Sequence, residues 1–267
     1  MPISSPISIR PINQEEFARI DYQVMRRAFD SQNELGRLCD EVIYQNDLVA
    51  RLESAGFGPV RKEVPSTVTH GSFAKTYWLD LVVADAAIYE LKTSAALIAE
   101  HDAQVLNYLF LHGAQHGKLV NFRPGKVESK FVNTTHTAHT RREIDIDARR
   151  WRESDDASQL IRERMTDLLK DWGGFLELPL YTEALTHFLG GEETVLRMIL
   201  LSRDGVPLGS HRVHMLASDV AFRLTALPDG AESYEPHLLA LLRHSPLRAI
   251  QWINMSHHRI EFVTLTK

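Results

Sequence analysis

The residues best suited to chemistry in this chain are two acids and a lysine, Asp80, Glu90 and Lys92. A turn is expected at Ala84-Asp85. Asp80 lies five residues before Asp85 and Glu90 five residues after it. A hairpin folded about that turn sets the two acids opposite each other, with Cβ atoms about 5 Å apart. Lys92 lies two residues beyond Glu90 and therefore on the same face. The hairpin should direct two carboxylates and one ammonium at one place.

Two acids held side by side among apolar residues are costly to bury unless something neutralises them. The expected strands around them, 75–83 and 87–92, are mostly apolar or aromatic. Mg²⁺ and Mn²⁺ prefer oxygen ligands. Such a cation would bind a phosphate oxygen and lower the pKa of water, while Lys92 orients that water or offsets charge in the transition state. The pattern therefore predicts phosphodiester hydrolysis. The alternative is a surface ion pair of Lys92 with either acid, because the spacing also occurs by chance.

The elements that must position these residues follow from hydrophobic periodicity and turn residues. Apolar residues recur at helical spacing through 14–54, with a kink or a loop near 33–36. Thr93 or Ser94 is expected to cap the helix that follows the hairpin. The expected order is α-β-β-β-α-β-β: a helical segment 14–54, strands 60–68, 75–83 and 87–92, a helix 96–111, and strands 118–122 and 130–133.

The composition then changes, which indicates a domain boundary. We expect a first domain at 1–135, a polar linker at 136–156 and an accessory α+β domain at 157–267. This last part has no recognised enzyme motif, so partner binding, oligomerisation or substrate choice are its expected tasks. Its expected elements are helices 157–172, 180–189 and 236–243 and strands 194–202, 211–216, 220–227, 250–255 and 259–266.

The overall composition indicates an ordinary soluble globular protein, with 44% hydrophobic and 24% charged residues among 267. No apolar run approaches the roughly 18 residues of a membrane helix, and the N-terminus lacks a secretory apolar region. The single cysteine, Cys39, excludes an intramolecular disulfide framework and fits a reducing, cytoplasmic setting. A net charge of −5 argues against nonspecific coating of nucleic acid, but a nuclease needs only a local basic patch.

The site residues and the helix after them resemble the PD-(D/E)xK nuclease superfamily. Gln104 and Tyr108 resemble the QxxxY motif of its RecB-like and lambda-exonuclease-like branches. Within the superfamily, residues 15–135 are most similar to the small bacterial GxxExxY proteins. One departure is Leu38, which stands where that family has its first glycine. The residues that carry this similarity are Leu35-Gly36, Glu41, Tyr44, Val64-Pro65, Asp80 to Val83, Glu90 to Lys92, His101, Gln104, Tyr108 and Leu119 to Phe122.

The resemblance implies an α/β fold with a restriction-endonuclease-like three-layer core, in which helices flank a mixed central sheet. It implies metal ligation by Asp80, Glu90 and the Leu91 backbone carbonyl, with Lys92 catalytic. Gln104 would face the site from its helix. Glu41 is a further candidate ligand, and its alternative is a solvated helix charge.

Substrate contacts are expected from Tyr108, Lys75, Arg123 and Lys126, although Tyr108 could equally be a core aromatic. Other basic residues in the same half are weaker candidates for phosphate contacts: Arg61, Lys62, Lys118 and Lys130. The C-terminal histidines predict no metal site, because His211 and His214 would point to opposite faces of a strand, as would His257 and His258.

The expected function is a Mg²⁺- or Mn²⁺-dependent deoxyribonuclease, serving phage defence or DNA repair. An RNase with the same site and a noncatalytic subunit of a larger assembly are the alternatives. DNA or RNA would be the partner, with no membrane, and a homo-oligomer or a protein partner would form through the C-terminal domain. The sequence does not separate endonucleolytic from exonucleolytic cleavage.

Overall fold

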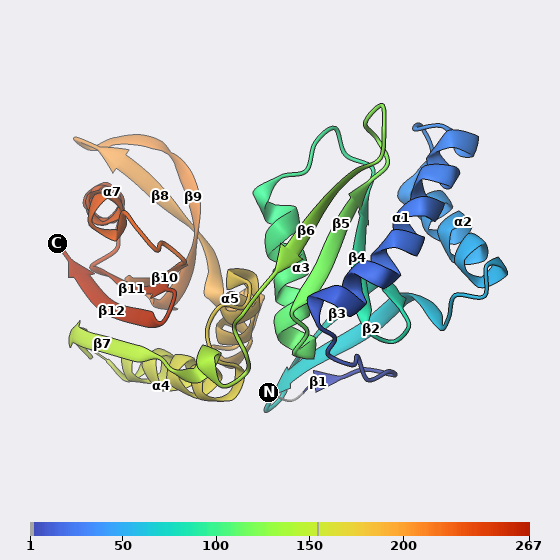
Figure 1. Cartoon of the computed structure of the whole chain (residues 1–267). Coiled ribbons are helices and arrows are strands. Elements are labelled where there is room, and N and C mark those ends of the chain that lie inside the picture. The colour runs from blue at the N-terminus through green and yellow to red at the C-terminus, as the bar shows by residue number, and fades with distance from the viewer. Residues whose placement is uncertain (1–2, 154) are drawn as a thin grey trace. The chain divides into compact units, whose positions relative to one another are not determined.

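The computed structural model describes residues 3–153 and 155–267. The chain forms two compact units. The first comprises Met1–Thr69 and Ala74–Thr140, and the second comprises His70–Phe73 and Arg141–Lys267. Figure 1 shows both with their elements labelled. In the described part of the chain, no helix is both long and apolar enough to span a bilayer.

Two helices open the first unit, α1 (Gln14–Leu35) and α2 (Glu41–Ser54). The side chain of Asn13 caps α1 by accepting a hydrogen bond from the Glu16 backbone N–H at 2.9 Å. Helix α1 stops at Gly36, whose φ of 76° is readily adopted only by glycine. The break expected near 33–36 is therefore a loop between two helices.

The first sheet has the strand order β1-β2-β3-β4-β5-β6. Strands β4 and β5 run parallel, whereas β1–β2, β3–β4 and β5–β6 are antiparallel pairs. Helix α3 (Ala99–His112) makes the crossover from β4 to β5 that a parallel pair requires. The strands are β1 (Ile3–Ser4), β2 (Val60–His70), β3 (Phe73–Val83), β4 (Ala87–Lys92), β5 (His116–Asn121) and β6 (Glu128–Asn133).

Helices cover both faces of this sheet, as Figure 1 shows, with α1 and α2 on one side and α3 on the other. Phe17 of α1 stacks on Tyr89 of β4, and Tyr44 of α2 stacks on Phe122, which directly follows β5. On the opposite face α3 lies so close to β5 that a Cβ on Gly117 would be 2.9 Å from Cγ1 of Val105. The mixed α/β architecture is consistent with the expected nuclease core.

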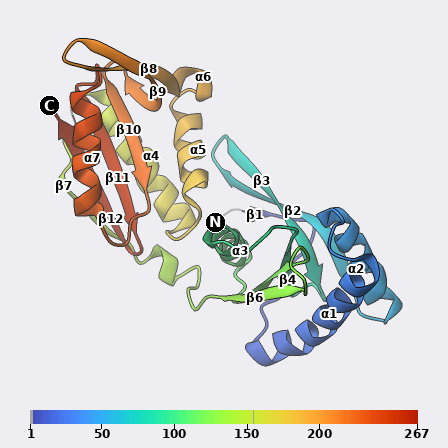
Figure 2. The ribbon, with the colours of Figure 1, turned by 90° about the horizontal axis from the view of Figure 1, so that it is seen from above.

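The second unit contains a mixed sheet in the order β7-β12-β11-β10-β9-β8. Helix α7 packs on one face, and α4 and α5 lie on the other (Figure 2). The strands are β7 (Asp145–Arg150), β8 (Leu196–Arg203), β9 (Val206–Ala217), β10 (Val220–Thr225), β11 (Ala249–Ser256) and β12 (Arg259–Thr266). The helices are η1 (Thr140–Arg142), α4 (Asp156–Trp172), α5 (Leu178–Phe188), α6 (Glu192–Val195) and α7 (Ala231–Arg243).

Strand β7 lies inside 136–156, the segment expected to be a polar linker. It pairs in parallel with β12 at the edge of the second sheet. Its side chains are exposed or half-buried along its whole length, so the strand has no buried face. The charged, polar composition of 136–156 predicted a linker. That prediction is wrong for Asp145–Arg150, which forms a strand.

Two helix starts also differ from expectation. Helix α7 begins at Ala231, so Pro236 lies within the helix and not at its first turn. Helix α3 begins at Ala99, with Ile98 at the N-cap position, and neither Thr93 nor Ser94 caps it. The residues between β4 and α3 instead form a loop that other side chains hold in place.

Candidate active site

The β3–β4 hairpin brings the two predicted acids opposite each other. Leu81 pairs with Tyr89, and Val83 pairs with Ala87 across a turn centred on Asp85. One step further along this register, Asp80 faces Glu90. Asp85 adopts the left-handed conformation, with a φ of 45°, which Asp tolerates better than most residues. The residue pairing that was predicted by counting residues on either side of Asp85 is therefore the pairing that the structure shows.

Two short hydrogen bonds hold the predicted residues, one between Asp80 and the Leu91 backbone and one between Lys92 and Glu90. The Leu91 backbone N–H donates to Asp80 Oδ2 at 2.8 Å, which fixes the orientation of that carboxylate. Lys92 Nζ donates to Glu90 Oε1 at 2.5 Å. The second carboxylate oxygen of Glu90, Oε2, is buried and has no hydrogen-bond partner among the residues that the structure describes. Glu90 is only 1% exposed, so bulk water does not compensate for the missing partner.

Burial perturbs the pKa of both acids, and at Glu90 the charge of Asp80 adds to it. Burial, followed by the charge of Asp80, raises the pKa of Glu90 to about 8 despite the nearby Lys92. Burial also raises the pKa of Asp80, although the Leu91 N–H and Lys92 oppose the shift. Burial acts to lower the pKa of Lys92, but Glu90 and Asp80 outweigh it and leave that pKa above its usual value. Lys92 therefore remains charged while Glu90 holds a proton at neutral pH.

These observations fit a divalent cation. A buried carboxylate oxygen without a partner, beside a second carboxylate, is an oxygen donor set of the type that Mg²⁺ and Mn²⁺ prefer. Within residues 3–153 and 155–267, no three His, Cys, Asp or Glu side chains form a ready metal-binding group. The fit rests on the Asp80 and Glu90 pair, without Glu41 as a third side-chain ligand. The side chain of Leu91 is buried in the sheet.

Helix α2 and strand β2 contribute three further polar residues beside the hairpin. Gln45 Nε2 donates to the Asp80 carbonyl at 2.9 Å and to Glu63 Oε1 at 2.7 Å. Glu41 receives a hydrogen bond from the Thr93 backbone, and burial raises its pKa, with Lys92 opposing the shift. Glu63 lies in strand β2 with a φ of 49°, a strained conformation for this residue type that often marks a functional site.

Sequence reasoning missed Gln45 and Glu63. Gln45 lies four residues after Glu41, hence on the same helix face, and that spacing was the signal available. Nothing in the local pattern of β2 distinguishes Glu63 from a solvated strand charge.

Helix α3 supplies the predicted Gln104 and Tyr108. Gln104 Nε2 donates to the Tyr108 hydroxyl at 2.9 Å, and that hydroxyl donates to the Trp78 carbonyl at 3.2 Å. Trp78 lies two residues before Asp80 on β3, so the pair ties α3 to the strand that carries the acid. Tyr108 is 4% exposed and packs in the core. The hydrogen bond from Tyr108 to the Trp78 carbonyl helps to position β3. The amide of Gln104 points to the Tyr108 hydroxyl.

The loop after Lys92 is held by Asn121, the last residue of β5, and by Arg123, two residues further along the chain. Asn121 Nδ2 donates to the Ser94 carbonyl at 2.9 Å, and the Ser94 N–H donates back to Asn121 Oδ1 at 3.1 Å. Arg123 Nε donates to the Thr93 carbonyl at 3.1 Å. Arg123 was expected to contact substrate, but its guanidinium supports the backbone of this loop. Asn121 was part of the family resemblance without an assigned role.

The remaining basic residues separate into exposed and paired groups. Lys126 is exposed in the turn between β5 and β6. Lys75 is half-buried, with Nζ 5.1 Å from the centre of the Tyr77 ring. Lys118 is buried and donates to Asp21 Oδ2 at 2.6 Å, so its expected phosphate contact is wrong for this conformation. Arg61 pairs with Asp85, and Lys130 pairs with Asp102.

Residues 18–133 match the family model described as the PD-(D/E)XK nuclease superfamily. Nearly all of these residues lie in the first unit. The match supports the superfamily resemblance seen in the motifs and indicates a nuclease, a phosphodiesterase of a group that generally uses divalent metals. It does not confirm the GxxExxY subgroup.

A solved structure described as "Crystal structure of SSO0001" shares 21% sequence identity with the chain. The alignment covers 44% of this chain and 62% of that chain, with a TM-score of 0.27. The chain therefore spans less than two thirds of that protein's length. Comparison with curated proteins gave no match.

Proposed function

We propose that the chain is a metal-dependent nuclease that hydrolyses phosphodiester bonds of DNA at Asp80, Glu90 and Lys92. One observation supports the proposal above all others. Glu90 is buried beside Asp80 with one carboxylate oxygen lacking any partner, and its pKa is about 8. Such an arrangement is unfavourable for a structural residue, since the hydrogen bond from Lys92 uses only Oε1. It is suited to holding a cation.

In this proposal, Asp80 and Glu90 hold a Mg²⁺ or Mn²⁺ ion through their carboxylate oxygens, with the Leu91 carbonyl as a further ligand. When bound, the ion would polarise a phosphate oxygen and make water a better nucleophile. The Leu91 N–H keeps Asp80 in one orientation, and Gln45 fixes the backbone at the same residue. Glu90 must lose its proton to bind a cation, so binding releases a proton from the site.

Lys92 has a separate task. Its Nζ carries three donors, and one of them is committed to Glu90 Oε1. The other two are available to orient the attacking water or to stabilise negative charge on the phosphate in the transition state. Lys75 and Lys126 are the proposed contacts to the phosphate backbone.

The test is incubation of the protein with linear, circular and single-stranded DNA and with RNA, in Mg²⁺, Mn²⁺ or EDTA. We expect cleavage of a DNA substrate in either metal, none in EDTA, and none by a Lys92→Ala variant. Cleavage of RNA alone would replace the proposed substrate while keeping the site. Full activity in EDTA would exclude the mechanism, and no cleavage of any substrate would favour a noncatalytic subunit.

A further inference from the structure

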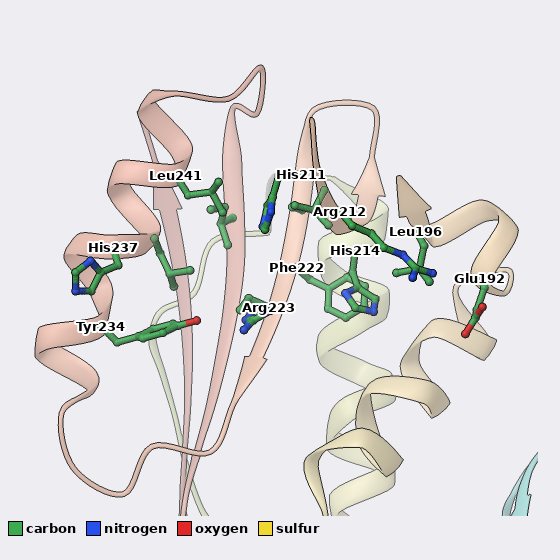
Figure 3. A pocket seen from close by; sticks show the side chains of 14 residues that line it. Glu192, Leu196, His211, Arg212, His214, Phe222, Arg223, Tyr234, His237 and Leu241 are labelled. Carbon is green, nitrogen blue, oxygen red and sulfur yellow. The ribbon is translucent and has the colours of Figure 1, made fainter. Parts of the chain in front are cut away.

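The second unit contains a pocket of about 500 Å³ between helix α7 and strands β9 and β10 (Figure 3). Figure 3 shows the side chains of Arg212 and Arg223 directed apart, so these two arginines do not form one anion site. Leu238, Leu241 and Ile250 make much of the remaining lining apolar. The pocket lining therefore does not specify a ligand. The first unit, in contrast, has an exposed aromatic side chain beside its two acids.

Trp78 of strand β3 is 53% exposed, whereas the other three tryptophans of the chain are buried. Those three are Trp151, Trp172 and Trp252. Contact of so large an apolar ring with water is unfavourable, and covering it with a ligand recovers that free energy. Tryptophan is accordingly enriched where proteins bind their partners most strongly. The ring of Trp78 is therefore a candidate contact for the substrate of the neighbouring site.

The exposed face of β3 leads directly to Asp80. Along this strand the exposed side chains of Thr76 and Trp78 alternate with the buried side chains of Tyr77 and Leu79. Residues two apart on a strand share a face and lie about 7 Å apart along the chain. Trp78 therefore lies on the same face as Asp80, one side-chain position before it.

Helix α3 fixes the backbone of Trp78. The Tyr108 hydroxyl donates to the Trp78 carbonyl at 3.2 Å, and Gln104 Nε2 donates to that hydroxyl at 2.9 Å. These bonds hold the strand in place at Trp78 while the indole ring stays exposed. A tryptophan side chain has only two rotatable bonds, so ordering the ring against a ligand costs little conformational entropy. The indole is thus a prepared surface beside the acids.

Strand β2 places an uncharged neighbour beside this ring. Strands β2 and β3 are joined by only two residues and therefore run antiparallel. Thr67 Oγ1 and Thr76 Oγ1 lie 2.8 Å apart, so these two residues are neighbours across the strands. Two residues further along this register, Pro65 lies beside Trp78, and its side chain is half-buried. The surface next to Asp80 is therefore suited to an apolar ring and not to a phosphate.

A nucleobase is the ring that a nuclease substrate would bring to this surface. Bases of a single strand are free to stack on aromatic side chains. Bases inside a duplex stack on one another and present only their edges in the grooves. A phosphate held at Asp80 and Glu90 carries a nucleoside on each side, so one adjacent base comes close to Trp78. An unpaired strand makes this contact, and an intact duplex does not.

We propose that Trp78 stacks on the base next to the scissile phosphate and that the substrate is an unpaired strand of DNA. The proposal rests on the proposed cleavage at Asp80, Glu90 and Lys92, and it adds the substrate class to that function. Trp78 is then a residue that determines specificity, because its contact is made before any bond is broken and requires an unstacked base.

The test combines two measurements on the full chain in EDTA at low salt. Intrinsic fluorescence reports on Trp78 because the other tryptophans are buried. Anisotropy of a labelled oligothymidylate measures affinity without relying on any tryptophan. We expect the single strand to bind and to quench the fluorescence, and a blunt duplex of the same length to leave the fluorescence unchanged. A duplex with a single-stranded overhang should quench as the single strand does.

Trp78→Ala should weaken binding of the single strand by roughly 5- to 150-fold, the loss of one stacked base. Trp78→Phe keeps an aromatic face, so it should retain most of the affinity while losing the fluorescence change. Tyr22→Leu is the matched control, because it removes a 67% exposed aromatic ring from helix α1 and should bind as wild type. Thermal melts establish that each variant is folded.

Binding of the single strand without quenching, or equal affinity in Trp78→Ala, would overturn the proposal. So would equal quenching by the blunt duplex, or no single-strand binding at about 0.1 mM. Loss of a wild-type dimer in Trp78→Ala, seen by light scattering, would show instead that a second copy covers the ring. Cleavage in Mg²⁺ separates the two claims: quenching without cleavage of any substrate would support the stacking and remove the proposed function. Cleavage of single strands with the same KM in wild type and Trp78→Ala would overturn the stacking alone.

Discussion

Glu90 combines three properties that a single glutamate rarely has together. It is almost fully buried, it faces a second carboxylate, and it is held by the neighbouring Lys92 through only one of its oxygens. Burial and Asp80 raise its pKa to about 8. Without a bound cation, Glu90 is therefore protonated at neutral pH, and binding of a cation would deprotonate it.

The pKa of Glu90 predicts how stability depends on pH without metal. The folded state binds the proton more tightly than the unfolded chain, whose pKa is near 4.5. This group therefore favours folding fully below about pH 4.5, and its contribution is lost as the pH rises through about 8. Between about pH 5 and pH 9, the free energy of unfolding in EDTA should fall by on the order of a few kcal/mol more for wild type than for Glu90→Gln.

Urea unfolding of both proteins across that range measures the difference. The Glu90→Gln protein keeps the size of the side chain and removes its titration, so titrating groups that do not interact with Glu90 cancel in the comparison. Parallel stability curves for the two proteins would mean that Glu90 does not carry a raised pKa in solution.

At the residue scale, the sequence predicted the pairing of Asp80 with Glu90 because a turn centre and the two-residue period of strands determine it. The contacts of Gln45, Glu63 and Asn121 could not be predicted in this way. They depend on how α2, β2 and the loop after β4 meet the hairpin, which no local pattern specifies. The hydrogen bond from Arg123 Nε to the Thr93 carbonyl could not be predicted either, and the substrate contact of Arg123 stays a prediction.

The elements that position the hairpin are packed closely. Helix α3 lies on β4 and β5, and it approaches β5 closely at Gly117. Most helix and strand spans follow from apolar periodicity, but an edge strand such as β7 has no buried face to produce an alternating pattern. Pro236 was read as a helix start because proline is common there, although α7 includes it further along.

This packing predicts a specific sensitivity at Gly117. A methyl group there would lie 2.9 Å from Val105 Cγ1 and 3.2 Å from Leu109 Cδ2, so α3 would have to shift. Gly117→Ala should destabilise the protein by about 1 to 3 kcal/mol. Gly125→Ala is the matched control, because no atom lies within 4 Å of its added Cβ. Thermal unfolding compares them, and equal melting temperatures would contradict the close packing of α3 on β5.

At the scale of the whole molecule, the family match and the acidic hairpin belong to the first unit, while the second unit has its own sheet and its own pocket. Two units with separate cores allow separate tasks. The sequence predicted domains at 1–135 and 157–267 with a linker between them, whereas the two units of the structure meet at Thr140 and Arg141, and His70–Phe73 belongs to the second unit.

The division predicts that the C-terminal histidines do not carry out cleavage. Alanine at His211, His214, His257 and His258 together should leave the rate on a simple DNA substrate within a few-fold of wild type. His211 and His214 line the pocket, and His257 and His258 contact Phe175, all within the second unit. A quadruple variant that melts as wild type and binds DNA, yet does not cut it, would show that chemistry extends beyond the hairpin.

The central claim is most directly tested by comparing three isosteric substitutions within the one hairpin. Asp80→Asn and Glu90→Gln each remove a carboxylate from the site, whereas Asp85→Asn removes one from the turn, where it only pairs with exposed Arg61. With Mg²⁺ and the DNA substrate cut fastest by wild type, Asp80→Asn and Glu90→Gln should lower the cleavage rate by roughly a hundredfold or more. The rate of Asp85→Asn should stay near wild type. Wild-type rates for Asp80→Asn and Glu90→Gln, or an equal loss in Asp85→Asn, would contradict the account.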